Sequence, residues 1–260
     1  MFKILKDLAP IAQDRERKMQ YILDQLHEQR TPCQLQQFEP QGFNIIVNQS
    51  PQNRVILSAH YDGDDLNDNL CSVAILLKLS EMSLGVETML LFTDLEEQGG
   101  RGMQAFVDQY GTPLPMVVLE LTGRGDTVLL GESAFGFMPY QGVPQYKEIP
   151  LDKYLLMMLE GCACTVGSRY RKQAVPPADH FIYAVAGGRS SLLSMAHSAD
   201  FGVIERMRRG TPLMWLFEGI NQHESTIANI PPYGRTNLID LRRESMQTIY
   251  DLLRCFIKKI

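Results

Sequence analysis

Short apolar runs that end in or beside a histidine or a carboxylate constrain the fold of this chain more than any other feature. Arg54–Tyr61, Thr88–Thr93 and Met116–Leu121 are typical of strands buried on both faces. Stretches with helical spacing separate them, among them Asn69–Met82 and Gly102–Tyr110. Strands that alternate with helices in this way predict an α/β fold, a three-layer αβα sandwich around a central mixed, mostly parallel sheet.

Periodic segments extend this pattern toward both ends of the chain. Residues 11–30 are typical of an amphipathic helix, and Cys33–Phe38 with Phe43–Val47 of a strand hairpin. Gly131–Glu148 has no clear period and is expected to be a loop. Because no break in composition divides the chain, we expect a single catalytic domain over residues 1–260. The remaining expected elements are strands at Asp126–Leu130 and Arg189–Met195 and helices at Leu151–Cys162, Phe201–Arg209 and Thr236–Ile257.

Charge, hydropathy and cysteine content exclude several classes of partner. The formal net charge of -5 argues against a nucleic-acid-binding surface, which is normally basic. No apolar run reaches the roughly 18 residues that a membrane span needs, and the N-terminal residues lack the apolar stretch of a signal peptide. The five cysteines are odd in number and widely spaced, which is typical of reduced thiols. We therefore expect a cytoplasmic protein with no nucleic-acid or membrane partner.

Ionisable side chains stand where the expected buried strands end. His60 closes the first strand, Glu96 and Glu97 follow the second, and Glu120 closes the third. Asp68 lies in the loop after the first strand, where a helix begins. Sites in open α/β sheets form at the carboxyl ends of strands, and imidazole and carboxylate are ligands that Zn²⁺ accepts. A buried carboxylate is costly unless a cation neutralises it, so the pattern predicts a metal site.

Each of these residues also has a purely structural explanation. Taken one at a time, they could be a helix cap, a hydrogen-bonded core histidine, solvated loop carboxylates and a carboxylate paired with a nearby arginine. These explanations apply in turn to Asp68, His60, Glu96 with Glu97, and Glu120, whose arginine would be Arg101 or Arg124. All of them must hold together to remove the metal site, and their joint occurrence therefore favours the metal.

The same segment resembles the co-catalytic zinc exopeptidases, the family that includes bacterial leucyl aminopeptidases, glutamate carboxypeptidase II and glutaminyl cyclases. The family pattern is His-x-Asp, then Asp-Asn at the start of a helix, then Asp-x-Glu-Glu-x-Gly. All three parts occur in order, as His60–Asp62, Asp68–Asn69 and Asp94–Gly99. The resemblance is close over residues 55–125 and implies a zinc exopeptidase-like fold.

The resemblance also implies a role for each matching residue. Asp62 would orient the first histidine through a hydrogen bond to its ring. Glu96 would be the general base for a water that lies between the metals. Two zinc ions are expected, with one ion as the alternative, and Asp68 would bridge the pair. The implied zinc ligands are His60, Asp68, Glu97, Glu120 and His223.

The C-terminal part of the resemblance is weaker. Asp179 and His180 match an Asp-His pair that lies behind the ligands or near the substrate, although Ala178 replaces the usual serine before it. Glu120 stands where the family more often has Asp. The Asp that typically follows the last histidine ligand is missing after His223. His197 is the competing last ligand, but it lacks the following helix of the family pattern.

These features predict a zinc-dependent hydrolase that removes an N-terminal residue from a peptide or an aminoacyl small molecule. A glutaminyl-cyclase-like acyltransferase with one zinc is the alternative. That branch typically carries a tryptophan just before the last ligand, where this chain has Gln222, and the single tryptophan is Trp215. A metal-free binding domain on the same fold is a third reading. A homo-oligomer is compatible with each of them.

Two segments without periodicity are expected to wall the substrate pocket. Gly131–Glu148 and Thr211–Gly234 carry aromatic residues and flank a strand end or the implied last ligand. Small-molecule sites are mostly apolar with a few polar groups. The candidate pocket residues are therefore Phe137, Tyr140 and Trp215, and packing of the loops on the core is the alternative explanation for each.

Overall fold

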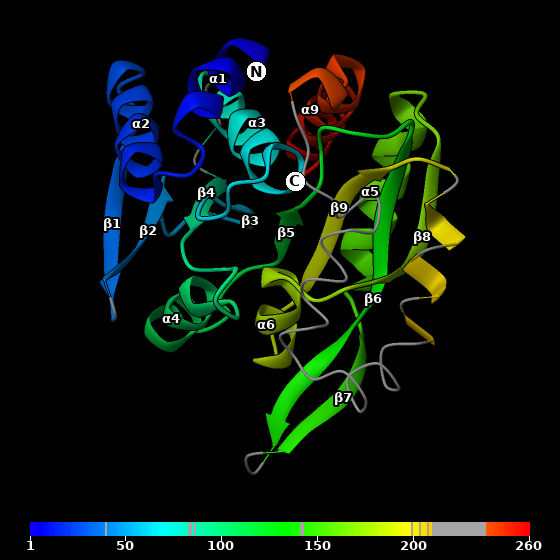
Figure 1. The fold of residues 1–260 in the computed structure, drawn as a ribbon. Coiled ribbons are helices and arrows are strands. Elements are labelled where there is room, and N and C mark those ends of the chain that lie inside the picture. Colours follow the sequence, from blue (N-terminus) through cyan, green and yellow to red (C-terminus); the bar gives the residue numbers. More distant parts are fainter. Residues whose placement is uncertain are drawn as a thin grey trace.

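The structure, a computed structural model, places nine strands in one sheet that lies between two layers of helices (Figure 1). It describes residues 1–39, 41–82, 85, 87–140, 143–198, 200–202, 204–206, 208–209 and 238–260, and the side chains of residues 137–144 are outside this description. The strands are β1 (Cys33–Phe38), β2 (Gly42–Val47), β3 (Val55–His60), β4 (Thr88–Thr93), β5 (Met116–Leu119), β6 (Thr127–Tyr140), β7 (Val143–Pro150), β8 (Tyr170–Val175) and β9 (Ser190–Ala196).

The sheet is mixed, with its parallel strands at the centre. The strand order is β1-β2-β4-β3-β5-β9-β6-β7, and β8 pairs with β6. β4, β3, β5 and β9 are parallel neighbours, whereas β1, β2 and β7 are added by antiparallel pairing. The central strands β3, β4 and β5 are buried along their whole length, as helices on both faces of a parallel sheet require. The predicted fold class is therefore confirmed.

Helices cover both faces of this sheet. They are α1 (Phe2–Leu8), α2 (Arg15–Glu28), α3 (Cys71–Ser80), α4 (Arg101–Tyr110), α5 (Lys153–Thr165), α6 (Asp179–Val185) and α9 (Arg243–Ile257), with a π-helix at Leu66–Leu70 before α3. One apolar core joins α1, α2, α3, α5 and α9 to the sheet, and a second core joins α4 and α6 to the other face. None of the described helices is long and apolar enough to cross a membrane.

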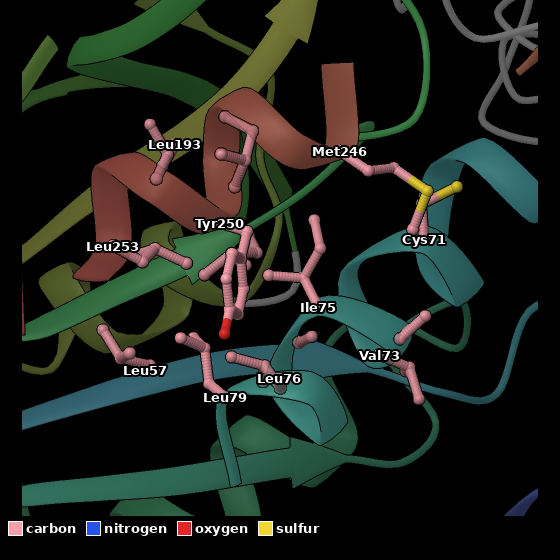
Figure 2. Packing of buried hydrophobic residues seen from close by; sticks show 14 of the residues in the cluster. Leu57, Cys71, Val73, Ile75, Leu76, Leu79, Leu193, Met246, Tyr250 and Leu253 are labelled. Atoms are coloured by element: carbon pink, nitrogen blue, oxygen red, sulfur yellow. The ribbon is translucent and has the colours of Figure 1, made fainter. Parts of the chain in front are cut away.

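α3 is apolar on nearly every side because other helices enclose it. Nine of its ten residues are buried, and it contacts α1, α2 and α9 as well as β3. Figure 2 shows Ile75 and Leu79 of α3 meeting Tyr250 and Leu253 of α9 over the sheet. A helix that is hydrophobic all round is stable only when it is buried in this way. The enclosed helix fixes the position of the turn that precedes it, which carries Asp68.

α9 also holds the loop that follows β5. The Arg242 N–H donates to the Gly123 carbonyl at 2.8 Å, and the Ser245 hydroxyl donates to the Gly125 carbonyl at 2.6 Å. An added Cβ at Gly125, whose φ is +121°, would lie 2.5 Å from the Ala196 carbonyl carbon. Only glycine fits this close approach of two backbones. The C-terminal helix therefore helps to place the loop beyond Glu120.

The expected loop at Gly131–Glu148 is wrong. β6 continues to Tyr140 and pairs antiparallel with β7, from Ser133 opposite Pro150 to Tyr140 opposite Val143. The far end of this hairpin extends away from the body of the sheet (Figure 1). Glycines and prolines interrupt the alternation of apolar side chains here, and backbone pairing between the two strands replaces the missing pattern. β8 and the short helix α6 were also not predicted.

Candidate metal centre

His60 ends β3 and lies at the centre of a cluster of carboxylates. Parallel β3, β4 and β5 end at the same edge of the sheet, which brings Glu120 after β5 beside His60. The ring of His60 is buried, and its Nε2 lies 3.2 Å from Glu120 Oε2 and 3.9 Å from Asp68 Oδ2. Two predicted carboxylate ligands from separate parts of the chain therefore lie beside the same ring nitrogen of His60.

The other ring nitrogen of His60 faces a second set of carboxylates. Nδ1 lies 3.2 Å from Asp62 Oδ1 and 3.9 Å from Glu96 Oε2. Asp62 Oδ2 accepts a hydrogen bond from the Glu97 backbone N–H at 3.1 Å. Asp62 thus holds the histidine ring with one oxygen and the Glu96–Glu97 turn with the other, which is the orienting position predicted for it.

Left-handed backbone conformations place the acidic residues at the ends of β4 and β5. Leu95 has a φ of +55° and Leu121 a φ of +51°, although neither is glycine. Such a conformation costs an L-residue roughly 1–2 kcal/mol and persists only where its surroundings enforce it. At Leu95 the enforcing contact comes from Asp94, whose carboxylate accepts the Leu95 N–H and the Phe43 N–H, each at 3.0 Å. The sharp turn that follows aims Glu96 toward His60.

Asp68 does not cap the helix that follows it. Asp65 caps the π-helix, because its carboxylate accepts the N–H groups of Asn67 and Asp68 at 2.8 and 2.9 Å. The Asp68 carbonyl accepts the Leu121 N–H at 3.2 Å, which joins this turn to the segment after β5. The side chain of Asp68 is left to face His60, so a cap does not explain it.

Two groups of side chains among the described residues have the composition and spacing to hold a metal ion. They are His60 with Asp68 and Glu120, and His60 with Glu96 and Glu97, and within each group the ligand atoms lie within 4.8 Å of one another. Glu120 Oε1 is buried and has no hydrogen-bond partner in the described part of the chain. No arginine of the described residues forms an ion pair with Glu120, which pairs with His60 instead. These oxygen and nitrogen donors fit a zinc ion.

Burial and the charges of neighbouring side chains shift the pKa values of the residues in the cluster. Burial alone would lower the pKa of His60, but Glu120, Asp62 and Glu96 outweigh it and raise that pKa well above 6.5. Burial and the neighbouring carboxylates raise the pKa of Glu96 and of Asp68 well above their ordinary values. Burial also opposes ionisation of Asp62, yet hydrogen bonds from His60 and from backbone N–H groups lower its pKa. A cation would relieve this repulsion.

Asp179 lies beside the cluster, whereas His180 belongs to neither ligand group. Asp179 Oδ2 accepts the Thr93 hydroxyl at 2.5 Å, and its buried Oδ1 has no partner among the described residues. Burial raises the pKa of Asp179 to about 7. Both ring nitrogens of buried His180 lack a described partner, and burial lowers the pKa of His180 to about 3.

The remaining candidates lie away from the cluster or outside the described residues. His197, the competing last ligand, follows β9, donates its backbone N–H to Asp200 at 3.3 Å, and belongs to neither ligand group. His223 and Trp215 fall outside the described residues. Phe137 and Tyr140 lie on β6, but their side chains are not described. The roles expected for these four residues stay predictions.

The sequence analysis missed Lys18, a buried lysine of α2 beside the cluster. It lies in a stripe with Ile22 and Leu26, one helical turn apart, and these three residues are the buried positions of α2. A lysine in register with an apolar stripe is a signal that could have identified it. Asp65 and Thr93 were also missed, because Asp65 and Asp68 are equally suitable caps in sequence and a hydroxyl that bonds to a buried carboxylate leaves no distinctive pattern.

Comparison with known proteins supports the fold. By sequence, the chain matches no protein-family model and no curated protein. By structure, it is similar to the Legionella pneumophila LapA aminopeptidase, with 10% identity, a TM-score of 0.69, and coverage of 99% of this chain and 71% of LapA. A Zn-dependent exopeptidase from Parabacteroides distasonis has 14% identity, a TM-score of 0.66, and coverage of 98% and 96%. Fimbriiglobus ruber glutaminyl cyclase has 14% identity, a TM-score of 0.61, and coverage of 98% and 93%. The chain therefore has the co-catalytic zinc exopeptidase fold that its motifs predict.

Proposed function

We propose that this chain is a zinc-dependent hydrolase and that it acts as an aminopeptidase on peptides or aminoacyl small molecules. The observation that carries the proposal is the convergence of five predicted ligand and base residues on one edge of the sheet. They are His60, Asp68, Glu96, Glu97 and Glu120. The likeness to a zinc exopeptidase and to an aminopeptidase supports the same class of chemistry.

The hydrogen bond between Asp62 and His60 determines which ring nitrogen is available to a metal ion in this proposal. Asp62 accepts the Nδ1–H of His60, so Nε2 is the ring nitrogen directed at Glu120 and Asp68. One zinc ion would be held by His60, Asp68 and Glu120, and Glu97 with the further proposed ligand His223 would complete the site of a second ion. Bound zinc polarises a carbonyl oxygen and makes a water more acidic. Asp68 would be the shared ligand if two ions are present.

Glu96 is the proposed general base. Its carboxylate is half-buried, lies near His60, and has a raised pKa because of burial and the carboxylates around it. A carboxylate in this position can take a proton from the attacking water and then give it to the leaving amine as the C–N bond breaks. Asp62 keeps the histidine ring in place during this exchange, and it does not itself transfer a proton.

A glutaminyl-cyclase-like acyl transfer with one zinc is the second candidate. The observation in its favour is the likeness to Fimbriiglobus ruber glutaminyl cyclase, of which the chain spans 93%. In that reaction the substrate's own amine attacks its side-chain carbonyl and releases ammonia. A metal-free binding domain is the third reading. The buried oxygen of Glu120 that has no hydrogen-bond partner among the described residues argues against it.

One experiment separates the three readings. The purified protein is stripped of metal with a chelator and reloaded with zinc, and its zinc content is measured by elemental mass spectrometry. The same sample is assayed on aminoacyl p-nitroanilides, on dipeptides and on peptides with an N-terminal glutamine. Two equivalents of zinc with release of the N-terminal residue support the aminopeptidase. One equivalent with ring closure of glutamine supports the cyclase, and neither zinc binding nor turnover contradicts both enzymes.

A further inference from the structure

A completely buried lysine lies next to the candidate metal centre. Lys18 is 0% exposed, although the other charged residues of its helix are exposed or, in the case of Arg15, partly exposed. Burying an ammonium group is costly unless hydrogen-bond acceptors and negative charge surround it. Its place in the buried stripe of α2 would suit an apolar residue better, so the ammonium itself requires an explanation.

The acceptors of Lys18 belong to the loop that follows β3. Its Nζ donates to the Asp62 carbonyl at 2.9 Å and to the Gly63 carbonyl. Burial lowers the pKa of Lys18 to about 8, and the charges of Asp62, Asp64 and other nearby carboxylates oppose that shift. The lysine therefore binds backbone acceptors and also places a positive charge beside an acidic cluster.

The opposite side of the same loop packs against the candidate centre. An added Cβ at Gly63 would lie 2.0 Å from Asn69 Nδ2 and 2.5 Å from Glu97 Oε1. Asp62, one residue earlier, contacts both the His60 ring and the Glu97 N–H. The loop is thus enclosed between Lys18 on one side and Asn69 and Glu97 on the other. A shift of its backbone would move Asp62 and Glu97 together.

We infer that Lys18 is a positioning residue of this centre. Its ammonium holds the Asp62 and Gly63 carbonyls, which keeps Asp62 on His60 and keeps Gly63 against Glu97. The effect on zinc binding rests on the proposed function, whereas the effect on the loop itself does not. A side chain of similar length without a donor would fill the same space but leave two buried carbonyls unpaired.

Lys18→Met in the metal-free protein tests the inference, with Leu26→Ala as the matched control. Leu26 lies in the same buried stripe of α2 and is also 0% exposed. Amide hydrogen exchange is measured for Glu97, whose N–H is bonded to Asp62. We expect Lys18→Met to speed exchange of this amide by about tenfold or more relative to the central strands, and Leu26→Ala to leave that ratio unchanged. Equal ratios in the two variants would overturn the inference.

The change in zinc affinity is a second measurement, and its direction separates loss of charge from loss of ligand position. Loss of a positive charge alone would strengthen cation binding, whereas loss of ligand position typically weakens it by about 10–100-fold. Weaker zinc binding by Lys18→Met than by Leu26→Ala supports positioning, and stronger binding contradicts it. If Lys18→Met does not fold, Lys18→Gln replaces it, because the shorter side chain of Gln does not bring its amide to the position of the ammonium. Faster exchange of the Glu97 amide than in Leu26→Ala is again the expected result. A wild-type protein that binds no zinc would refute the proposed function, and the exchange ratio would still decide the role of Lys18.

Discussion

The carboxylate of Asp62 lies 3.2 Å from the Nδ1 atom of His60, and this contact leaves Nε2 as the ring nitrogen that faces Glu120 and Asp68. We predict that Asp62→Asn weakens zinc binding by about 10–100-fold, because an amide in place of the carboxylate no longer selects the ring orientation or supports the histidine as a ligand. Competition with a chromophoric chelator measures the effect. Asp64→Asn, which removes an exposed carboxylate from the same loop, is the control, and an equal loss in both variants would contradict the assignment.

Adjacent Glu96 and Glu97 are predicted to have different functions. Glu96→Gln keeps its shape but loses its proton acceptor, so we expect zinc content to be retained and kcat to fall by about 10²–10⁴-fold. Glu97→Gln removes a proposed ligand and is expected to lose zinc. Metal content and kcat are measured on the same preparations. Identical zinc content in the two variants would show that the division of functions is wrong.

Removal of metal should lower activity and stability together. The carboxylates around His60 repel one another without a cation, and any ligand that binds only the folded state stabilises it. Zinc at roughly 100 times its dissociation constant would contribute about 2.7 kcal/mol to the free energy of unfolding. Thermal melting with and without a strong chelator measures this. A melting temperature and a turnover that are both unchanged after verified stripping would exclude the metal.

Buried His180 should make the metal-free protein sensitive to acid. Its pKa is about 3 when folded and 6.5 ordinarily, so the unfolded chain binds the extra proton between these values. Its contribution to stability is complete above pH 6.5 and is lost as the pH falls toward 3. Between pH 7 and pH 5 the loss is about 2 kcal/mol. Urea unfolding of wild type and His180→Gln at both pH values measures it, and equal pH dependence in the two proteins would refute the prediction.

Phe137, Tyr140 and Trp215 stay the predicted walls of the substrate pocket. Truncation of a pocket residue to alanine should change KM or substrate preference and leave the melting temperature nearly unchanged. Truncation of a packed core Phe or Trp would instead cost about 3–5 kcal/mol of stability. Melting and kinetics of the three alanine variants separate these cases. If all three only destabilise the protein, the pocket lies elsewhere.

Much of the candidate site was predictable because its residues terminate strongly apolar strands. The runs before His60, Glu96 and Glu120 have the composition of fully buried strands, and the carboxyl ends of neighbouring parallel strands must meet. The cap of the next helix was harder to assign, because Asp65 and Asp68 are equally suitable in sequence. Only the backbone geometry shows that Asp65 accepts the N–H groups.

Two features of the structure were not predicted from the pattern of apolar residues. The β6–β7 hairpin is held by backbone pairing across a stretch where Gly136 and Pro139 break the apolar alternation. Lys18 is in register with the apolar stripe of α2, but the sequence does not show what its ammonium contacts, because that depends on the docking of α2 against the loop after β3. The hairpin depends on backbone pairing and the Lys18 contact on tertiary structure, and neither leaves a periodic pattern of apolar residues.

The position of α9 has a consequence for the time at which the candidate site can form during synthesis. α9 encloses α3 and bonds to Gly123 and Gly125, so the turn with Asp68 and the segment after Glu120 both depend on it. α9 follows every proposed ligand in the chain, so it leaves the ribosome after all of them. We therefore expect nascent chains to expose the apolar surface of α3 and to capture zinc only after α9 has been synthesised and has packed on α3, which would make metal uptake a late step in folding.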